Sequence, residues 1–162
     1  MTSTASLSGN PVSKFISAMR LKGFHARIIL SILYGEKVFP ISFPFKILRK
    51  LINQAIYHCE IHPDSFISSD AILTLRLPHP FLIIVHRKVQ IGRNVTLFHN
   101  VTLGNREHGH SGYPIVEDNA YVGTGAVILG AVTLGHSATV GAMALVLSDV
   151  NPGQRAVGLH RR

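Results

Sequence analysis

The second half of the sequence repeats with a period of six residues. From residue 85 onward an apolar residue recurs every six positions, except for one step of thirteen between Leu103 and Val116. A series of small or β-branched residues follows these lead residues at a distance of four positions. The lead residues are Val85, Ile91, Leu97, Leu103, Val116, Val122, Ile128, Leu134, Val140 and Val146. The second series is Val89, Val95, Val101, Ala120, Ala126, Val132, Ala138, Ala144 and Val150.

A period of six fits neither an α-helix nor the long alternation of an ordinary strand. It fits short parallel strands joined by tight turns, three to a triangular coil of eighteen residues, with neighbouring coils ~4.8 Å apart. Val116 should then stack on Leu134, and Ile91 on Val116 once seven inserted residues are set aside. Glycine after several lead residues is expected to tolerate the conformation of the corner. A β-sandwich with chance spacing is the alternative, and the pattern favours a hexapeptide β-helix.

The β-helix is expected to occupy residues 59–162, with a weaker beginning at Ile61, Ile67 and Leu73. The step of thirteen predicts an extruded polar loop at residues 104–113, which contains His108 and His110. Functional residues are often carried on loops held by a rigid scaffold. This loop is therefore a candidate part of a site.

Residues 12–58 are expected to form a helical segment, after a disordered tail at residues 1–11. One amphipathic helix is predicted around Ile28, Ile29, Ile32 and Leu33, and a second around Phe45, Leu48, Ile52 and Ile56. The second helix carries a basic face made of Lys46, Arg49 and Lys50. Such a face is either simply solvated or attaches weakly to an acidic membrane surface.

Composition narrows the class of protein. The 162 residues include one cysteine, Cys59, which excludes a disulfide framework and favours a reducing cytoplasm. No apolar run approaches the ~20 residues of a membrane-spanning helix, and the first residues do not read as a secretory signal. The net charge of +8 favours an anionic partner such as a phosphate-bearing cofactor, an acidic glycan or a membrane. Nucleic acid is not expected, because no basic-aromatic binding module is present.

Four stretches carry a family resemblance: EIHP at 60–63, VTLGN at 101–105, PIVEDNAYVGTGAVILGAVTLG at 114–135 and AVGLHRR at 156–162. Over about residues 25–162 the chain resembles the serine acetyltransferase branch of the hexapeptide acyltransferases. Within that branch it looks more similar to the polysaccharide O-acetyltransferases of the colanic acid or capsule type. The resemblance implies a left-handed parallel β-helix that forms homotrimers. It also implies transfer of an acetyl group from acetyl-CoA to a hydroxyl, in a groove between subunits and without a metal.

The resemblance maps catalytic roles onto this chain. His79 falls where the family keeps its catalytic histidine, and a histidine is suited to remove the proton of an attacking hydroxyl near neutral pH. His99, twenty residues later, could share the same groove. Glu60 corresponds to the carboxylate that orients the histidine, with Asp64 and Asp70 as alternatives.

The family's coenzyme A cleft and acceptor loop also map onto named residues. The cleft maps to Gly104, Asn105, Thr124, Gly125 and Ala142, with Arg155, Arg161 and Arg162 placed to meet the phosphates. The extruded loop would cover the intersubunit groove, so His110 and Tyr113 are candidate substrate-binding residues.

Departures from the serine acetyltransferase pattern bear on the acceptor. Pro78 replaces the serine-binding acid, Gly112 replaces an arginine of the loop, and the chain ends at Arg162 without the family's C-terminal tail. These departures favour a sugar hydroxyl of a surface polysaccharide or its precursor. Alternatives are a serine acetyltransferase, a non-catalytic trimer, and a metalloenzyme of the carbonic anhydrase type that would use His79, His99 and His108 or His110.

Overall fold

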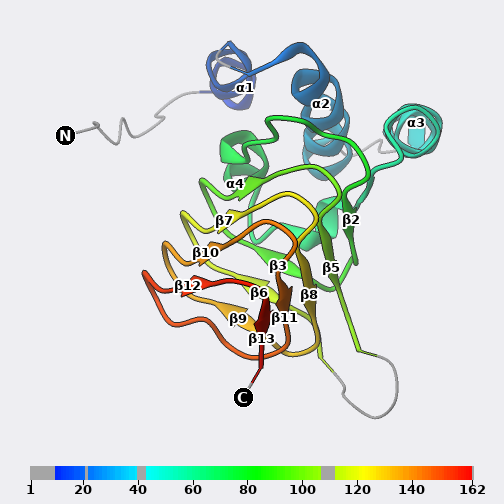
Figure 1. Ribbon diagram of the computed structural model, residues 1–162. Helices are drawn as coiled ribbons and strands as arrows, with labels where there is room; N and C mark the ends of the chain where they lie inside the picture. Colours follow the sequence, from blue (N-terminus) through cyan, green and yellow to red (C-terminus); the bar gives the residue numbers. More distant parts are fainter. Residues whose placement is uncertain (1–9, 21, 40–42, 107–111, 162) are drawn as a thin grey trace.

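The computed structural model describes residues 10–20, 22–39, 43–106 and 112–161. Helices gather at one end of a coil of short strands (Figure 1). The N-terminal helices are α1 (Pro11–Met19), α2 (Phe24–Val38) and α3 (Phe43–Leu48), and α3 continues into a π-helical segment, η1 (Arg49–Gln54). None of the helices in these ranges is long and apolar enough to cross a membrane. Residues 1–9 of the predicted tail lie outside the described residues.

The strands form three parallel sheets, here named A, B and C. Sheet A contains β1 (Glu60–Ile61), β2 (Ile84–Val85), β5 (Thr102–Gly104), β8 (Val127–Leu129), β11 (Leu145–Val146) and β13 (Leu159–His160). Sheet B contains β3 (Gln90–Ile91), β6 (Ile115–Val116) and β9 (Thr133–Leu134). Sheet C contains β4 (Thr96–Leu97), β7 (Tyr121–Val122), β10 (Thr139–Val140) and β12 (Arg155–Ala156). From β2 to β11 the chain visits A, B and C in turn, so each coil has three sides.

The register agrees with the sequence prediction. Val116 pairs with Leu134 one coil later, and Ile91 pairs with Val116 across the insertion. All lead residues and all members of the second series are buried, none of them more than 2% exposed. Each coil therefore stacks its apolar side chains on those of the next, and the mainly β class is confirmed. The left hand of the coil stays a prediction.

The glycines that follow the lead residues act differently from the prediction. The residue with positive φ stands two positions further on and is Asn94, Asn100 and Asn119 in three of the turns. Asparagine adopts this left-handed conformation more readily than most residues. Gly123 is needed instead for close stacking, because a Cβ there would lie 2.7 Å from the backbone nitrogen of Ala142.

The first coil departs from the predicted repeat. Ile67 is 59% exposed, and its neighbour Phe66 is buried and bridges to Ile91. Leu73 is buried, but it belongs to a helix, α4 (Ser69–Thr74), that follows a short 3-10 turn, η2 (Pro63–Ser65). The Ser68 side chain accepts a hydrogen bond from the N–H of Ala71 and caps α4. This helix-start signal overrides the six-residue spacing.

The two predicted helices differ in how they pack. Helix α2 buries Ile29, Ile32 and Leu33, as predicted. In the second helix Leu48 is 41% exposed and Ile56 is 62% exposed. The prediction that these two residues belong to a buried apolar face is therefore wrong. Helices α1, α2 and α3 and the segment η1 lie between residues 11 and 54, so α1 begins one residue before the predicted range 12–58, inside the predicted tail of residues 1–11. The domain boundaries stay predictions.

Replacement of Gly123 by alanine tests the stacking role of this glycine. Because the added Cβ meets the backbone of the next coil, we expect Gly123→Ala to lower the free energy of unfolding by about 1–3 kcal/mol. Gly104→Ala is the matched control: it also follows a lead residue, but its Cβ would meet only Leu129, at 3.7 Å. Urea unfolding at one protein concentration should show the difference, and equal stabilities of the two variants would contradict it.

Candidate active site

The fold brings His79 and His99 to the same corner of the coil. Each lies where the chain passes from sheet C to sheet A, in successive coils: His79 follows the bridge of Arg76 to Thr96, and His99 follows β4. Their ring centroids are 6.0 Å apart and the rings stand nearly edge to face. Here this edge, formed by residues 79–82, 98–100, 123–125 and 141–143, is called the histidine corner. The predicted proximity of the two histidines is confirmed, whereas their catalytic roles stay predictions.

The two imidazoles differ in their surroundings. His79 is exposed, and its ring centroid lies 6.4 Å from that of Phe98. His99 is half-buried, and its Nδ1 atom is buried without a hydrogen-bond partner among the described residues. A buried polar atom without a partner is costly.

No carboxylate is placed to orient His79 within the described part of the chain. Glu60 is exposed in β1, and its carboxylate makes no recorded hydrogen bond or ion pair there. Asp64 contacts other partners: its carboxylate lies 3.2 Å from His62 Nδ1 and 3.1 Å from an Arg87 guanidinium nitrogen. Asp70 lies in the first turn of α4. The orienting role of Glu60 therefore stays a prediction.

The residues predicted to bind coenzyme A divide between two edges of the coil. Thr124, Gly125 and Ala142 continue the histidine corner, where the Gly125 N–H donates to the His99 carbonyl at 3.1 Å. Gly104 and Asn105 lie at the edge where the chain passes from sheet A to sheet B, here called the loop corner.

The predicted arginines are also separated. Arg155 is exposed in β12 of sheet C, and Arg161 is exposed after β13 of sheet A. Arg162 and His110 lie outside the described residues, as does His108. A single chain therefore does not gather the whole predicted set into one described cleft.

Tyr113 lies at the loop corner and not beside the histidines. Its ring stacks on that of His86, with centroids 4.3 Å apart, and Lys88 Nζ lies 5.4 Å from the ring centroid. The sequence gives no sign of a role for His86, because its stacking on Tyr113 crosses from one coil to the next. The neighbouring Gly112 has a φ of 140°, and a Cβ there would lie 2.4 Å from the Cβ of Ala131. Residue 112 therefore has no room for a side chain.

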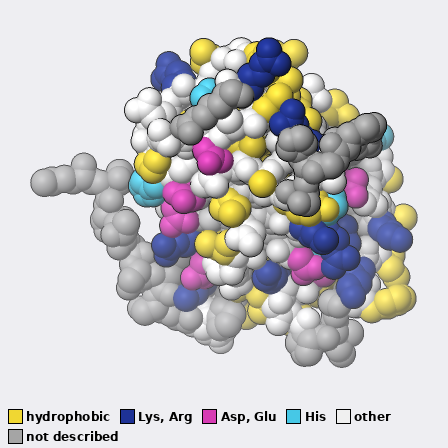
Figure 2. Space-filling model, turned by 90° about the horizontal axis from the view of Figure 1, so that it is seen from below, with side chains coloured by type: hydrophobic (Ala, Val, Ile, Leu, Met, Phe, Trp, Pro, Cys, Tyr) yellow, Lys and Arg dark blue, Asp and Glu magenta, His cyan; other side chains and the backbone are white. Residues whose placement is uncertain are grey.

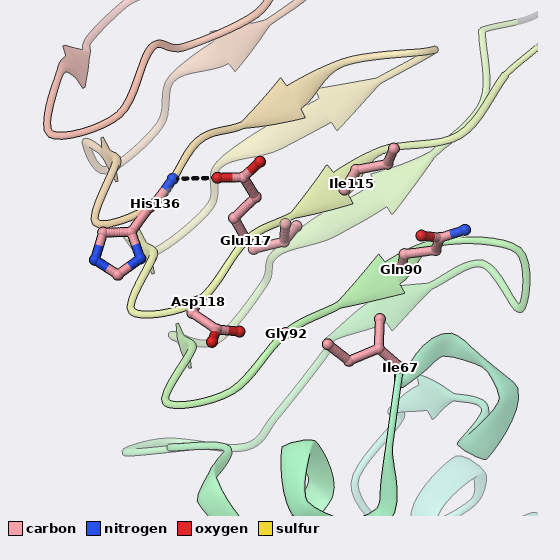
Figure 3. Close-up of a pocket in the computed structure, with 8 residues that line it drawn as sticks. Ile67, Gln90, Gly92, Ile115, Glu117, Asp118 and His136 are labelled. Atoms are coloured by element: carbon pink, nitrogen blue, oxygen red, sulfur yellow. Dashed lines mark hydrogen bonds between the residues drawn. The ribbon is translucent and has the colours of Figure 1, made fainter. Parts of the chain in front are cut away.

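A pocket on sheet B contains none of the predicted site residues (Figure 3). Its carboxylates already have partners. Asp118 accepts hydrogen bonds from the backbone N–H and the guanidinium of Arg93, and Glu117 accepts one from the backbone N–H of His136 at 2.6 Å. These contacts tie neighbouring coils together. No group of three or more His, Cys, Asp or Glu side chains in the described ranges is arranged to hold a metal ion.

The contact between Arg93 and Asp118 predicts a pH dependence of stability. Hydrogen bonds from the Arg93 backbone and guanidinium hold the pKa of Asp118 below its ordinary value of 3.8, although partial burial opposes them. A carboxyl with a depressed pKa stabilises the fold above the ordinary pKa, and this contribution disappears as the pH falls through the lower value. We expect Asp118→Asn to cost about 1 kcal/mol or less at pH 7, with the difference vanishing as the pH falls through the lowered pKa of Asp118. The free energy of unfolding of both proteins is measured in urea at a series of pH values. A difference between them that stays constant across the series would contradict the prediction.

Comparisons with known proteins agree with the architecture. No protein-family model matches the sequence. The chain is 34% identical to the serine acetyltransferase of Bacillus subtilis strain 168 over 123 residues, which are 73% of this chain and 54% of that protein. It spans about half the length of the curated relatives it matches. These relatives are serine acetyltransferases and not the polysaccharide O-acetyltransferases that the sequence analysis favoured.

Solved structures show the same relationship. The Neisseria gonorrhoeae serine acetyltransferase in complex with serine matches with a TM-score of 0.58 at 27% identity, over 87% of this chain and 52% of that one. The Brucella abortus strain S19 enzyme in complex with coenzyme A matches with a TM-score of 0.69 at 24% identity, over 93% of this chain and 65% of that one. Similarity of sequence and of fold together supports membership of the serine acetyltransferase hexapeptide-repeat family, for the part of the chain that the matches cover.

Proposed function

We propose that this protein is an acetyl-CoA-dependent O-acetyltransferase whose active site lies at the histidine corner. The observation that carries the proposal is the pairing of His79 with His99 in successive coils of a fold shared with serine acetyltransferases. Further support comes from the Brucella abortus relative, which was solved in complex with coenzyme A.

The chemistry requires a base beside the acceptor hydroxyl. As the hydroxyl oxygen attacks the thioester carbonyl carbon, His79 takes its proton, and the carbon–sulfur bond then breaks to release coenzyme A as the thiol. The proton held by His79 passes to the departing sulfur, so the imidazole returns to its neutral form. His99 lies beside His79 at the same corner, from where its ring would position the acceptor.

Small residues along the same edge suit the co-substrate. Thr124, Gly125 and Ala142 follow His99 along this edge, and the pantetheine arm would lie along them, beside the Met143 side chain that packs on Gly125. Arg155 and Arg161 carry exposed positive charge toward the C-terminal end of the coil, where the phosphates of coenzyme A would be attracted.

A homotrimer would complete the site. The outward face of sheet A is mostly apolar, with Thr102 and, at its first strand, Glu60 as the polar residues. Ile84 is 46% exposed, Leu159 is 54% exposed, and Val127 and Leu145 are half-buried. This face lies between the histidine corner and the loop corner. A closed ring of three chains with these faces turned inward sets the histidine corner of one chain beside the loop corner of the next. Tyr113 would then reach the histidines of a neighbouring subunit.

L-serine is the acceptor that the comparisons favour, because the relatives are named serine acetyltransferases and one was solved with serine. A saccharide hydroxyl is the second candidate, because Pro78 and Gly112 stand where the serine acetyltransferase pattern has a serine-binding acid and an arginine. Because Ala131 leaves no room for a side chain at residue 112, an arginine at this position could not bind the acceptor. The left-handed coil and a cytoplasmic location belong to the same proposal.

Replacement of His79 tests the catalytic proposal. We expect His79→Ala to lower the rate of thiol release from acetyl-CoA by about 10²–10⁴-fold, because the general base is removed. His136→Ala, an exposed histidine at another corner, should leave the rate unchanged. L-serine and an exopolysaccharide preparation should be compared as acceptors. An undiminished His79→Ala enzyme would overturn the assignment of the base, and release with the saccharide alone would reject serine.

Charged substitutions test the trimer. Ile84→Lys with Val127→Lys places two charges on the outward face of sheet A, and we expect a mass near that of the 17.7 kDa chain together with loss of activity. Ile115→Lys with Thr133→Lys places the same charges on sheet B and should keep the higher mass. Light scattering gives the masses. A trimer that survives the first pair, or that is lost with the second, would contradict the proposed interface.

A further inference from the structure

Helix α3 and η1 present three of their apolar residues to the outside. Phe43, Ile47 and Leu51, spaced four residues apart, are 70%, 43% and 61% exposed. Residues four apart lie on the same side of a helix, so these three make one stripe. Figure 1 shows α3 at the outer edge of the helical end, beside α2.

The opposite side of the same helix is fixed by specific contacts. The Phe45 ring packs against Gly35 of α2, where a Cβ would lie 2.2 Å from a ring carbon. Arg49 Nε donates to a Glu36 carboxylate oxygen at 2.9 Å, with both side chains largely buried. Asn53 is fully buried and its amide has no recorded partner among the described residues. Phe45, Arg49 and Asn53 therefore face the protein, while the apolar stripe faces away from it.

Positive charge surrounds the stripe. Lys46 and Lys50 are exposed on the same helix. Residues 1–58 hold eight Lys and Arg but one acidic residue, Glu36, so this segment carries +7 of the net charge of +8. Figure 2, which is viewed from below, shows Asp and Glu side chains as well as Lys and Arg on the other end of the coil. The excess of positive charge thus belongs to the helical end.

A basic cavity opens beside Lys46 and Arg49, on the side of the helix that faces α2. It has a volume of about 630 Å³ and is lined by Lys37, Lys46, Arg49 and Arg87, against two carboxylates, those of Glu36 and Asp64. Lys37 already donates to two backbone carbonyls, and Arg87 is paired with Asp64. Lys46 has no recorded partner among the described residues. A phosphate group at the cavity mouth would supply one.

We propose that α3 and η1 attach the protein to an anionic lipid surface, with the stripe in the headgroup region and Lys46 and Lys50 on the lipid phosphates. An apolar helical face flanked by lysines is the arrangement of helices that lie in the plane of a membrane interface. Charge complementarity favours anionic lipid over a second copy of this chain, whose helical end carries the same positive charge. This inference goes beyond the proposed function and does not depend on it.

The test is flotation of the full chain with vesicles of phosphatidylcholine, alone or in equal parts with phosphatidylglycerol. We expect salt-sensitive binding to the anionic vesicles only. Phe43→Gln with Leu51→Gln should abolish it, while Lys46→Gln with Lys50→Gln should weaken it about fivefold per lysine. Ile67→Gln with Ile115→Gln, which alters exposed apolar residues near sheet B, is the matched control and should bind as the unchanged protein does. Circular dichroism checks the fold of each variant.

Three outcomes would overturn the inference. The first is absence of binding to anionic vesicles, and the second is binding by Phe43→Gln/Leu51→Gln that equals binding by the unchanged protein. The third is a lower assembly mass for Phe43→Gln/Leu51→Gln than for the unchanged protein, which would make the stripe a contact between copies. Acetyl transfer to a soluble acceptor should survive the Phe43 and Leu51 substitutions. Loss of vesicle binding and failure of the catalytic proposal are thus separate results.

Discussion

Side-chain stacking between successive coils is the interaction on which the rest of this structure depends. A strand of two residues buries one side chain and exposes the other, so no strand has a core of its own. Leu97, for example, is buried only because its coil lies against the next one, where Val122 is its partner. Structures of this kind gain stability from contacts between neighbouring repeats. A coil with nothing beside it would expose its apolar interior.

The two ends of the coil show how this constraint is met. At the N-terminal end α2 packs on α4, and both contribute to the same continuous core as the strands. Ile29 and Leu30 of α2 and Ile72 of α4 are fully buried there. At the other end the last coil is shorter, with Leu145 paired to Leu159 after fourteen residues. The helical cap is therefore part of the core, and its outer surface remains for other contacts.

The corners are where this architecture leaves freedom. The insertion after β5 lengthens one turn without shifting the ladders on either side, since Thr102 still pairs with Val127. A corner also brings together residues one coil apart, as it does with His79 and His99. A rigid core and variable corners suit a protein whose chemistry is carried at its edges. The apolar stripe on α3 is a further surface that the core does not use.

The sequence by itself determined the coil and its register, because every buried lead residue is apolar and the six-residue spacing of these residues can be read directly from the sequence. It also indicated that His79 and His99 share a corner, since twenty residues is close to one coil. Only the tertiary structure decided that Phe66 replaces Ile67 in the first coil, and that Tyr113 lies across sheet A from the histidines. It also decided which apolar residues of α3 turn outward, among them Phe43 and Ile47. These features depend on contacts between segments distant in the chain, such as Phe45 against Gly35. A local pattern of side chains does not predict such contacts.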